Sequence, residues 1–244
     1  MHVRIPRTGL VTAMLLALSN MAQAEASIPV PTAQTQQQAE VATVASHDLA
    51  QFIQRTLEKG DAALAGGFPL NVRHVDELRG AKLGTGFPVF TIDARRLVGG
   101  ENDLSAMATP TGSWRFMIVA GAQPIGMATV DKVGGHWQTV AFGAATLSQE
   151  VSANLAAHSA TADGQFRFIR IYQAESDLLE FGAPGTKRPR YALLQSAQHA
   201  LFPQREAEQA APMHATQLMN QEDFIEPLRQ AAQANMAPSH GSGR

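Results

Sequence analysis

The sequence predicts a single α+β domain, mainly an antiparallel sheet with a three-stranded meander and helices packed on one face. Three observations predict it. Three β-rich runs follow one another at hairpin spacing, amphipathic helical patterns flank them, and strand and helix do not alternate as a doubly wound parallel sheet requires. With 244 residues, 45% of them apolar, the chain is long enough for one domain with a sizeable core, or at most two small ones.

The meander is the strongest supersecondary signal in the chain. Its runs are SWRFMIVA at 113–120, PIGMATV at 124–130 and HWQTVAFG at 136–143. The first two are joined by three residues and the last two by DKVGG, whose glycines allow the positive φ that a tight hairpin turn needs. We therefore expect three consecutive antiparallel strands.

One amphipathic helix is expected before the meander and a second one after it. Ser46 is a plausible N-cap for SHDLAQFIQRTLEK, in which Leu49, Phe52, Ile53 and Leu57 share one helical face, and Gly60 suits the C-terminal cap. The second helix spans 146–160 and carries Leu147, Val151, Leu155 and His158 on one stripe.

The remaining body is expected to form further strands and one long connection. GFPVFTID at 86–93 predicts an edge strand because it contains Pro88, whereas 97–112 is crowded with turn formers and predicts a connection. QFRFIRIYQA and DLLEFG predict two more strands, and YALLQSA predicts a last strand or the start of a helix.

The first 24 residues predict export. Arg4 and Arg7 precede the nine-residue apolar run LVTAMLLAL, and Ala22-Gln23-Ala24 matches the small-x-small pattern of a signal-peptidase site. The run is too short to span a membrane. The chain contains no cysteine, which removes disulfides, a thiol nucleophile and a lipoprotein anchor. We expect a bacterial periplasmic or secreted protein cleaved after Ala24, with no transmembrane span in the mature form.

Composition divides the rest into three parts. Residues 25–45 predict a flexible Gln/Pro-rich leader, 46–203 the α+β globular domain, and 204–244 a Gln/Ala-rich tail. Within the tail, MNQEDFIEPLRQAAQ predicts one amphipathic helix with Phe224, Ile225 and Leu228 directed inward.

His136 and the two tryptophans are the candidate ligand-binding residues. His136 and Trp137 begin the third meander strand, where alternation places their side chains on opposite faces. A histidine titrates near ambient pH and can act as a base or ligand, but an exposed hairpin residue is the simpler interpretation. Trp114 and Trp137 could form an aromatic platform, with core or sheet-rim positions as the alternative.

Lys187, Arg188 and Arg190 form the one compact basic stretch. They are candidates for contact with an anion or partner; a charged loop that keeps a sheet edge from pairing is the alternative. The overall balance of 19 basic and 21 acidic residues gives no basic surface for nucleic acid. Arg167 and Arg170 lie at odd spacing in one strand, so they do not form one basic groove.

No cofactor or metal site is predicted. His74 with Asp76 and Glu77 forms a compact His–carboxylate cluster, but its spacing matches no metal motif and favours a solvated turn. Met213, His214 and Met219 are a weak soft-metal set, and His158 is better explained by capping or burial near a helix end. The sequence has no nucleophile elbow, HExxH, SxxK, P-loop or dinucleotide fingerprint.

These features favour a non-enzymatic exported binding or accessory protein that recognises a protein, peptide or envelope ligand. Two alternatives remain open. One is a periplasmic or secreted hydrolase that uses a histidine such as His136 with partners not identifiable from sequence; the other is a cell-envelope assembly factor. The oligomeric state is not predicted.

Overall fold

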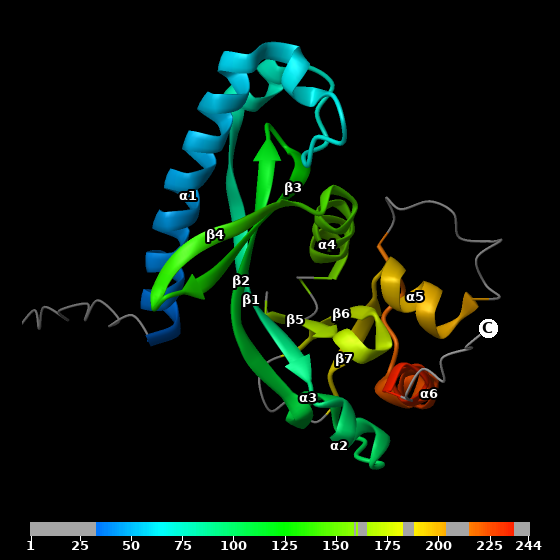
Figure 1. Ribbon diagram of the computed structural model, residues 1–244. Helices are drawn as coiled ribbons and strands as arrows, with labels where there is room; N and C mark the ends of the chain where they lie inside the picture. The colour runs from blue at the N-terminus through cyan, green and yellow to red at the C-terminus, as the bar shows by residue number, and fades with distance from the viewer. Residues whose placement is uncertain (1–32, 159, 161–164, 183–187, 204–214, 237–244) are drawn as a thin grey trace, which may run out of the picture.

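The computed structural model describes residues 33–158, 160, 165–182, 188–203 and 215–236 (Figure 1). Seven strands form one sheet in the order β4-β3-β2-β1-β5-β6-β7. All neighbouring pairs are antiparallel except β1 and β5, which run parallel. The predicted α+β class is confirmed. The strands are β1 (Ala81–Ile92), β2 (Ala108–Ala120), β3 (Gln123–Val133), β4 (His136–Gly143), β5 (Phe166–Ile171), β6 (Ser176–Phe181) and β7 (Arg190–Leu193).

The predicted meander is confirmed as β2-β3-β4. Gly134 and Gly135 have φ values of 60° and 87°, so the connection between β3 and β4 is the tight glycine turn that the sequence indicates. β1 extends the meander by pairing with β2.

The described helices lie between and around these strands. None of them is long and apolar enough to cross a membrane. YALLQSA forms both of its predicted alternatives, the strand β7 followed by a helix. The helices are α1 (Ala33–Lys59), α2 (Ala94–Val98), α3 (Leu104–Met107), α4 (Ala145–His158), α5 (Gln195–Leu201) and α6 (Ile225–Met236), with short 3-10 turns η1 (Gly60–Leu64), η2 (Val75–Gly80), η4 (Tyr172–Ala174) and η6 (Gln221–Asp223).

α1 begins at Ala33 rather than at Ser46. The flexible leader predicted for 25–45 is therefore wrong over 33–45, and residues 25–32 lie outside the described part of the chain. Val41 and Ala45 are fully buried and continue the stripe of Leu49 towards the N-terminus at four-residue spacing. Gln and Ala are good helix formers, so the composition that suggested a leader also suits a helix.

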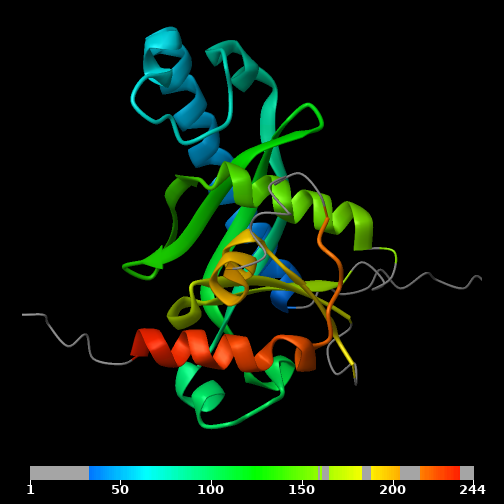
Figure 2. The same ribbon diagram turned by 90° about the vertical axis from the view of Figure 1, so that its right-hand side faces the viewer.

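Helices cover both faces of the sheet rather than one. Neighbouring residues of β2 show this, because Phe116 packs in the core beneath α1, whereas Met117 packs with Val151 of α4 on the opposite face. Figures 1 and 2 show α1 along the meander and α4 across the sheet from it. The predicted helix at 146–160 is confirmed as α4.

The segment 215–236 belongs to the folded body. Phe224, Leu228 and Ala232 are fully buried in a core shared with α2, α3, α5 and strands β5 to β7. Met219 exchanges two backbone hydrogen bonds with Tyr191 of β7. The predicted domain end at 203 is therefore too early. The predicted amphipathic helix is confirmed from Ile225 onward as α6, and Phe224, Ile225 and Leu228 are directed inward as expected, with Phe224 immediately before the helix.

β1 lies inside the sheet order, so its prediction as an edge strand is wrong for its C-terminal part. It pairs with β5 only at Val89 and Phe90, immediately after Pro88. Residues 81–88 therefore form a ladder only with β2 among the described strands, and Pro88 occupies a stretch with a free edge, as proline requires. The connection predicted at 97–112 is also revised, because it contains α3 and the start of β2.

Candidate functional site

His136 is exposed at the start of β4. None of the described residues forms a hydrogen bond or an ion pair with its ring. Within the described part of the chain, His136 is therefore hydrogen-bonded neither to the carboxylate nor to the hydroxyl that the hydrolase hypothesis requires.

The two tryptophans do not form an exposed pair. Trp114 is only 3% exposed and stacks on Phe116, with ring centroids 6.3 Å apart, in the core beneath α1. Trp137 is half-buried against the same core, and the Lys132 ammonium lies 4.8 Å from its ring centroid. Trp137 keeps some accessible surface, whereas the ring of Trp114 is covered.

Only part of the basic stretch can be located. Lys187 lies outside the described residues, and Arg188 is exposed. The Arg190 guanidinium donates a hydrogen bond of 2.6 Å to the Leu218 carbonyl, so Arg190 helps to hold the C-terminal segment on the sheet. Its role in ligand contact stays a prediction.

The other histidine candidates have structural partners. Glu77 accepts hydrogen bonds from the backbone N–H groups of Arg73 and His74, and these bonds lower the pKa of Glu77. His158 Nε2 donates to the Thr216 carbonyl at 2.8 Å. Met213 and His214 lie outside the described residues. Within the described ranges, no group of three or more His, Asp or Glu side chains is arranged to hold a metal ion.

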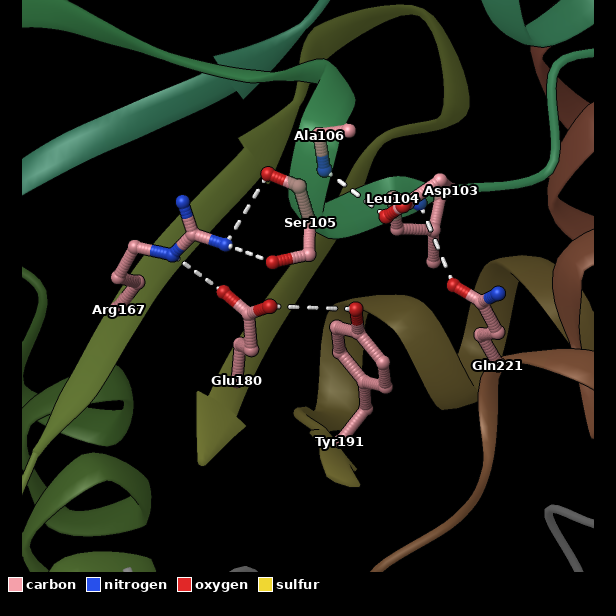
Figure 3. A network of polar contacts seen from close by, with 8 residues as sticks. All are labelled: Asp103, Leu104, Ser105, Ala106, Arg167, Glu180, Tyr191 and Gln221. Atoms are coloured by element: carbon pink, nitrogen blue, oxygen red, sulfur yellow. Dashed lines mark hydrogen bonds and ion pairs between the residues drawn. The ribbon is translucent and has the colours of Figure 1, made fainter. Parts of the chain in front are cut away.

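A buried polar network links β5, β6, β7 and α3 (Figure 3). Glu180 is 2% exposed; Arg167 Nε donates to one of its carboxylate oxygens and the Tyr191 hydroxyl donates to the other. A second Arg167 nitrogen donates to Ser105 Oγ at 2.6 Å. Gln221, at the start of η6, accepts from the Leu104 N–H at 3.3 Å and connects the network to the C-terminal segment.

The polar network has the chemistry of a structural link rather than that of a catalytic centre. Burial, followed by the charge of Glu180, raises the pKa of Tyr191 far above its ordinary value, so the phenol stays protonated. Both oxygens of Glu180 are already engaged. Ser105 Oγ faces a guanidinium, which cannot accept its proton.

A charge cluster of Arg115, Glu150, Arg170 and Asp177 lies on the face covered by α4. Asp177 is 6% exposed, and Arg170 Nε lies 3.8 Å from Asp177 Oδ1. Burial raises the pKa of Asp177 despite the two arginines. Burial also raises the pKa of Glu150, assisted by repulsion from Asp177, while its carboxylate accepts the N–H of Gln195 at 3.1 Å. Arg115 Nη1 and Asp177 Oδ1 are buried without hydrogen-bond partners in the described structure.

The groove between α1 and the N-terminal part of β1, here called the α1 groove, has a volume of about 670 Å³. One flank of α1 supplies residues at three- and four-residue spacing, with Leu49, Ile53 and Leu57 apolar and Gln54 and Glu58 polar. The opposite wall comes from η2 and β1. The lining residues are Ser46, Leu49, Ala50, Ile53, Gln54, Leu57, Glu58, Leu78, Arg79, Ala81, Lys82 and Leu83.

The α1 groove follows the free edge of β1. Ala81, Lys82 and Leu83 of β1 line the groove, and on the side away from β2 no described strand pairs with them. Sequence reasoning placed Leu49, Ile53 and Leu57 on one helical face, and no sequence signal indicated that they also line a groove.

Comparisons with known proteins add no relative: no protein family model, no curated protein and no solved structure matches this chain.

Proposed function

We propose that this chain is an exported, non-enzymatic binding or accessory protein that recognises a protein or peptide partner in the α1 groove. The observation that carries the proposal is the combination of apolar floor and polar rim in a groove of about 670 Å³. Apolar clefts with a few fixed polar groups are the usual form of a binding site. Export rests on the signal sequence predicted at 1–24.

The chemistry of the described residues supports binding rather than catalysis. His136 has no partner set, and the polar network holds its tyrosine, glutamate and serine in structural hydrogen bonds. The raised pKa values in the charge cluster accompany contacts that join α4, α5 and β6. No arrangement among them provides a nucleophile beside a base.

The test is capture of a partner by the mature chain from envelope extract of its host, compared between two variants. Ala50→Trp places a large ring in the α1 groove, whereas Ala39→Trp makes the same change at another exposed position of α1 outside the groove. We expect Ala50→Trp to lose the partner and Ala39→Trp to retain it. Equal capture by both variants would overturn the proposal.

A further inference from the structure

The free strand edges of this sheet differ in which groups pair with their backbone N–H and C=O groups. On β7, Tyr191 pairs with Met219 through two backbone hydrogen bonds. On β4, the Thr139 N–H is taken by the Asp48 carboxylate of α1 at 3.1 Å. On the free part of β1, Gln38 Nε2 donates to the Gly86 carbonyl, which lies beyond a register shift between Leu83 and Gly86. In the stretch from Ala81 to Leu83, the Ala81 N–H donates to the Leu78 carbonyl of η2, and no described side chain caps the other backbone groups on the side away from β2.

We propose that the α1 groove binds an extended peptide, which adds as a strand to the β1 edge at Ala81–Leu83 and carries an acidic residue beside Lys82. The inference rests on the proposed function and specifies its ligand. An open strand edge offers backbone N–H and C=O groups that only another extended chain satisfies in register. The adjacent apolar wall of α1 then accepts alternate side chains of the peptide.

The dimensions of the groove fit a strand. The flank of α1 from Ser46 to Glu58 is about 18 Å long at 1.5 Å per residue. That length corresponds to about five residues of extended chain at 3.3 Å per residue. A peptide of this size would span the apolar stripe Leu49, Ile53 and Leu57 while pairing with β1 at one end of the stripe.

The rim of the groove carries both signs of charge, with Lys82 on the β1 side and Glu58 on the α1 side, so an acidic residue is favoured beside Lys82 in particular. Lys82 is exposed on the edge strand, and no acidic group of the described chain forms an ion pair with its ammonium. Arg79, the neighbouring base, is already held by Asp76 at 2.9 Å. Opposite charges on adjacent strands attract, so an acidic residue next to Lys82 is favoured in the added strand.

The experiment uses the full mature chain and a random octapeptide library. Selected peptides are made in two forms, one native and one methylated at alternate backbone nitrogens, which removes strand hydrogen bonds but keeps the side chains. We expect acidic, alternately apolar peptides whose affinity falls at least about tenfold on methylation, a loss of about 1.4 kcal/mol. Ala50→Trp should abolish binding and Ala39→Trp should not. Lys82→Glu should weaken binding about threefold, and exchange of the peptide's acid for lysine should restore it.

The outcomes separate the two proposals. Binding that Ala50→Trp abolishes but methylation does not affect would overturn strand addition while retaining the groove as the site. Selection of peptides that bind only as helices, or self-association of the chain through this groove in place of peptide binding, would also overturn strand addition. Binding unaffected by Ala50→Trp, or no selected peptide, would overturn both.

Discussion

The two halves of the sheet are stabilised in different ways. In the half formed by β1 to β4, α1 packs on one apolar face and α4 on the other, and α1 lends single side chains, Gln38 and Asp48, to strand edges. In the half formed by β5 to β7, three short helices, a buried polar network and the segment 215–236 enclose the strands. The α1 groove lies in the first half beside its long helix, whereas in the second half Met219 pairs with the outer strand β7. The surface proposed for binding therefore lies in the first half.

Truncation tests the dependence of the second half on its C-terminal segment. A chain of residues 46–203 lacks α6 and the first part of α1, which removes Val41, Phe224 and Leu228 from two cores. In calorimetry, we expect a chain of residues 33–236 to unfold in one cooperative transition and the chain of residues 46–203 to lose it. Retention of one sharp transition by 46–203 would contradict the integration of the segment into the core.

Removal of one polar side chain from the buried network of β5 to β7 should strongly lower the free energy of unfolding. Glu180→Ala leaves the half-buried Arg167 without its ion-pair partner and the buried Tyr191 hydroxyl without its acceptor, and should cost about 3 kcal/mol in urea unfolding. Asp76→Ala removes the exposed partner of Arg79 and should cost at most about 1 kcal/mol. Equal costs for the two variants would mean that the polar network contributes no more than a surface pair.

Two variants of Glu150 distinguish the contribution of its hydrogen bond to stability from that of its charge. Glu150→Ala deprives the Gln195 N–H of its acceptor and should cost about 1–3 kcal/mol, whereas Glu150→Gln keeps an oxygen there and should cost less. Because burial raises the pKa of Glu150 above its ordinary 4.5 in the folded state, the folded protein binds this proton more tightly. The free energy of unfolding of the wild type, relative to Glu150→Gln, should therefore fall as the pH rises above 4.5. An opposite slope would contradict the assigned pKa direction.

Replacement of Asp48 should have a small effect on stability, with a pH dependence opposite to that of Glu150. Partial burial works to raise the pKa of Asp48, but hydrogen bonds from the Thr139 N–H and from His47 outweigh it and lower the pKa below 3.8. Asp48→Ala should cost about 1 kcal/mol at neutral pH. That advantage of the wild type should be present above pH 3.8 and be lost as the pH falls through the lowered pKa, which chemical unfolding at several pH values measures. A constant difference between the two proteins would count against the interaction.

Local patterns predicted the elements whose stability is mainly local. The meander and α4 follow from alternation, helical spacing and the glycines at 134 and 135. The boundaries at 46 and 203 failed because Val41 and Phe224 are buried by residues distant in the sequence, which composition does not report. The α1 groove was missed for the same reason: its walls join residues near 50 with residues near 80, and neither set is unusual alone.

The narrow parallel seam between β1 and β5 also bears on the order of folding. Only Val89 and Phe90 of β1 pair with β5, and the supporting hydrogen bond from Thr91 Oγ1 to the Arg170 carbonyl joins residues 79 positions apart. The hairpins on either side close short loops, whereas this seam must close a long one for two residue pairs. We expect the seam to form after the rate-limiting step, so that truncation of Val89 accelerates unfolding and leaves the folding rate nearly unchanged.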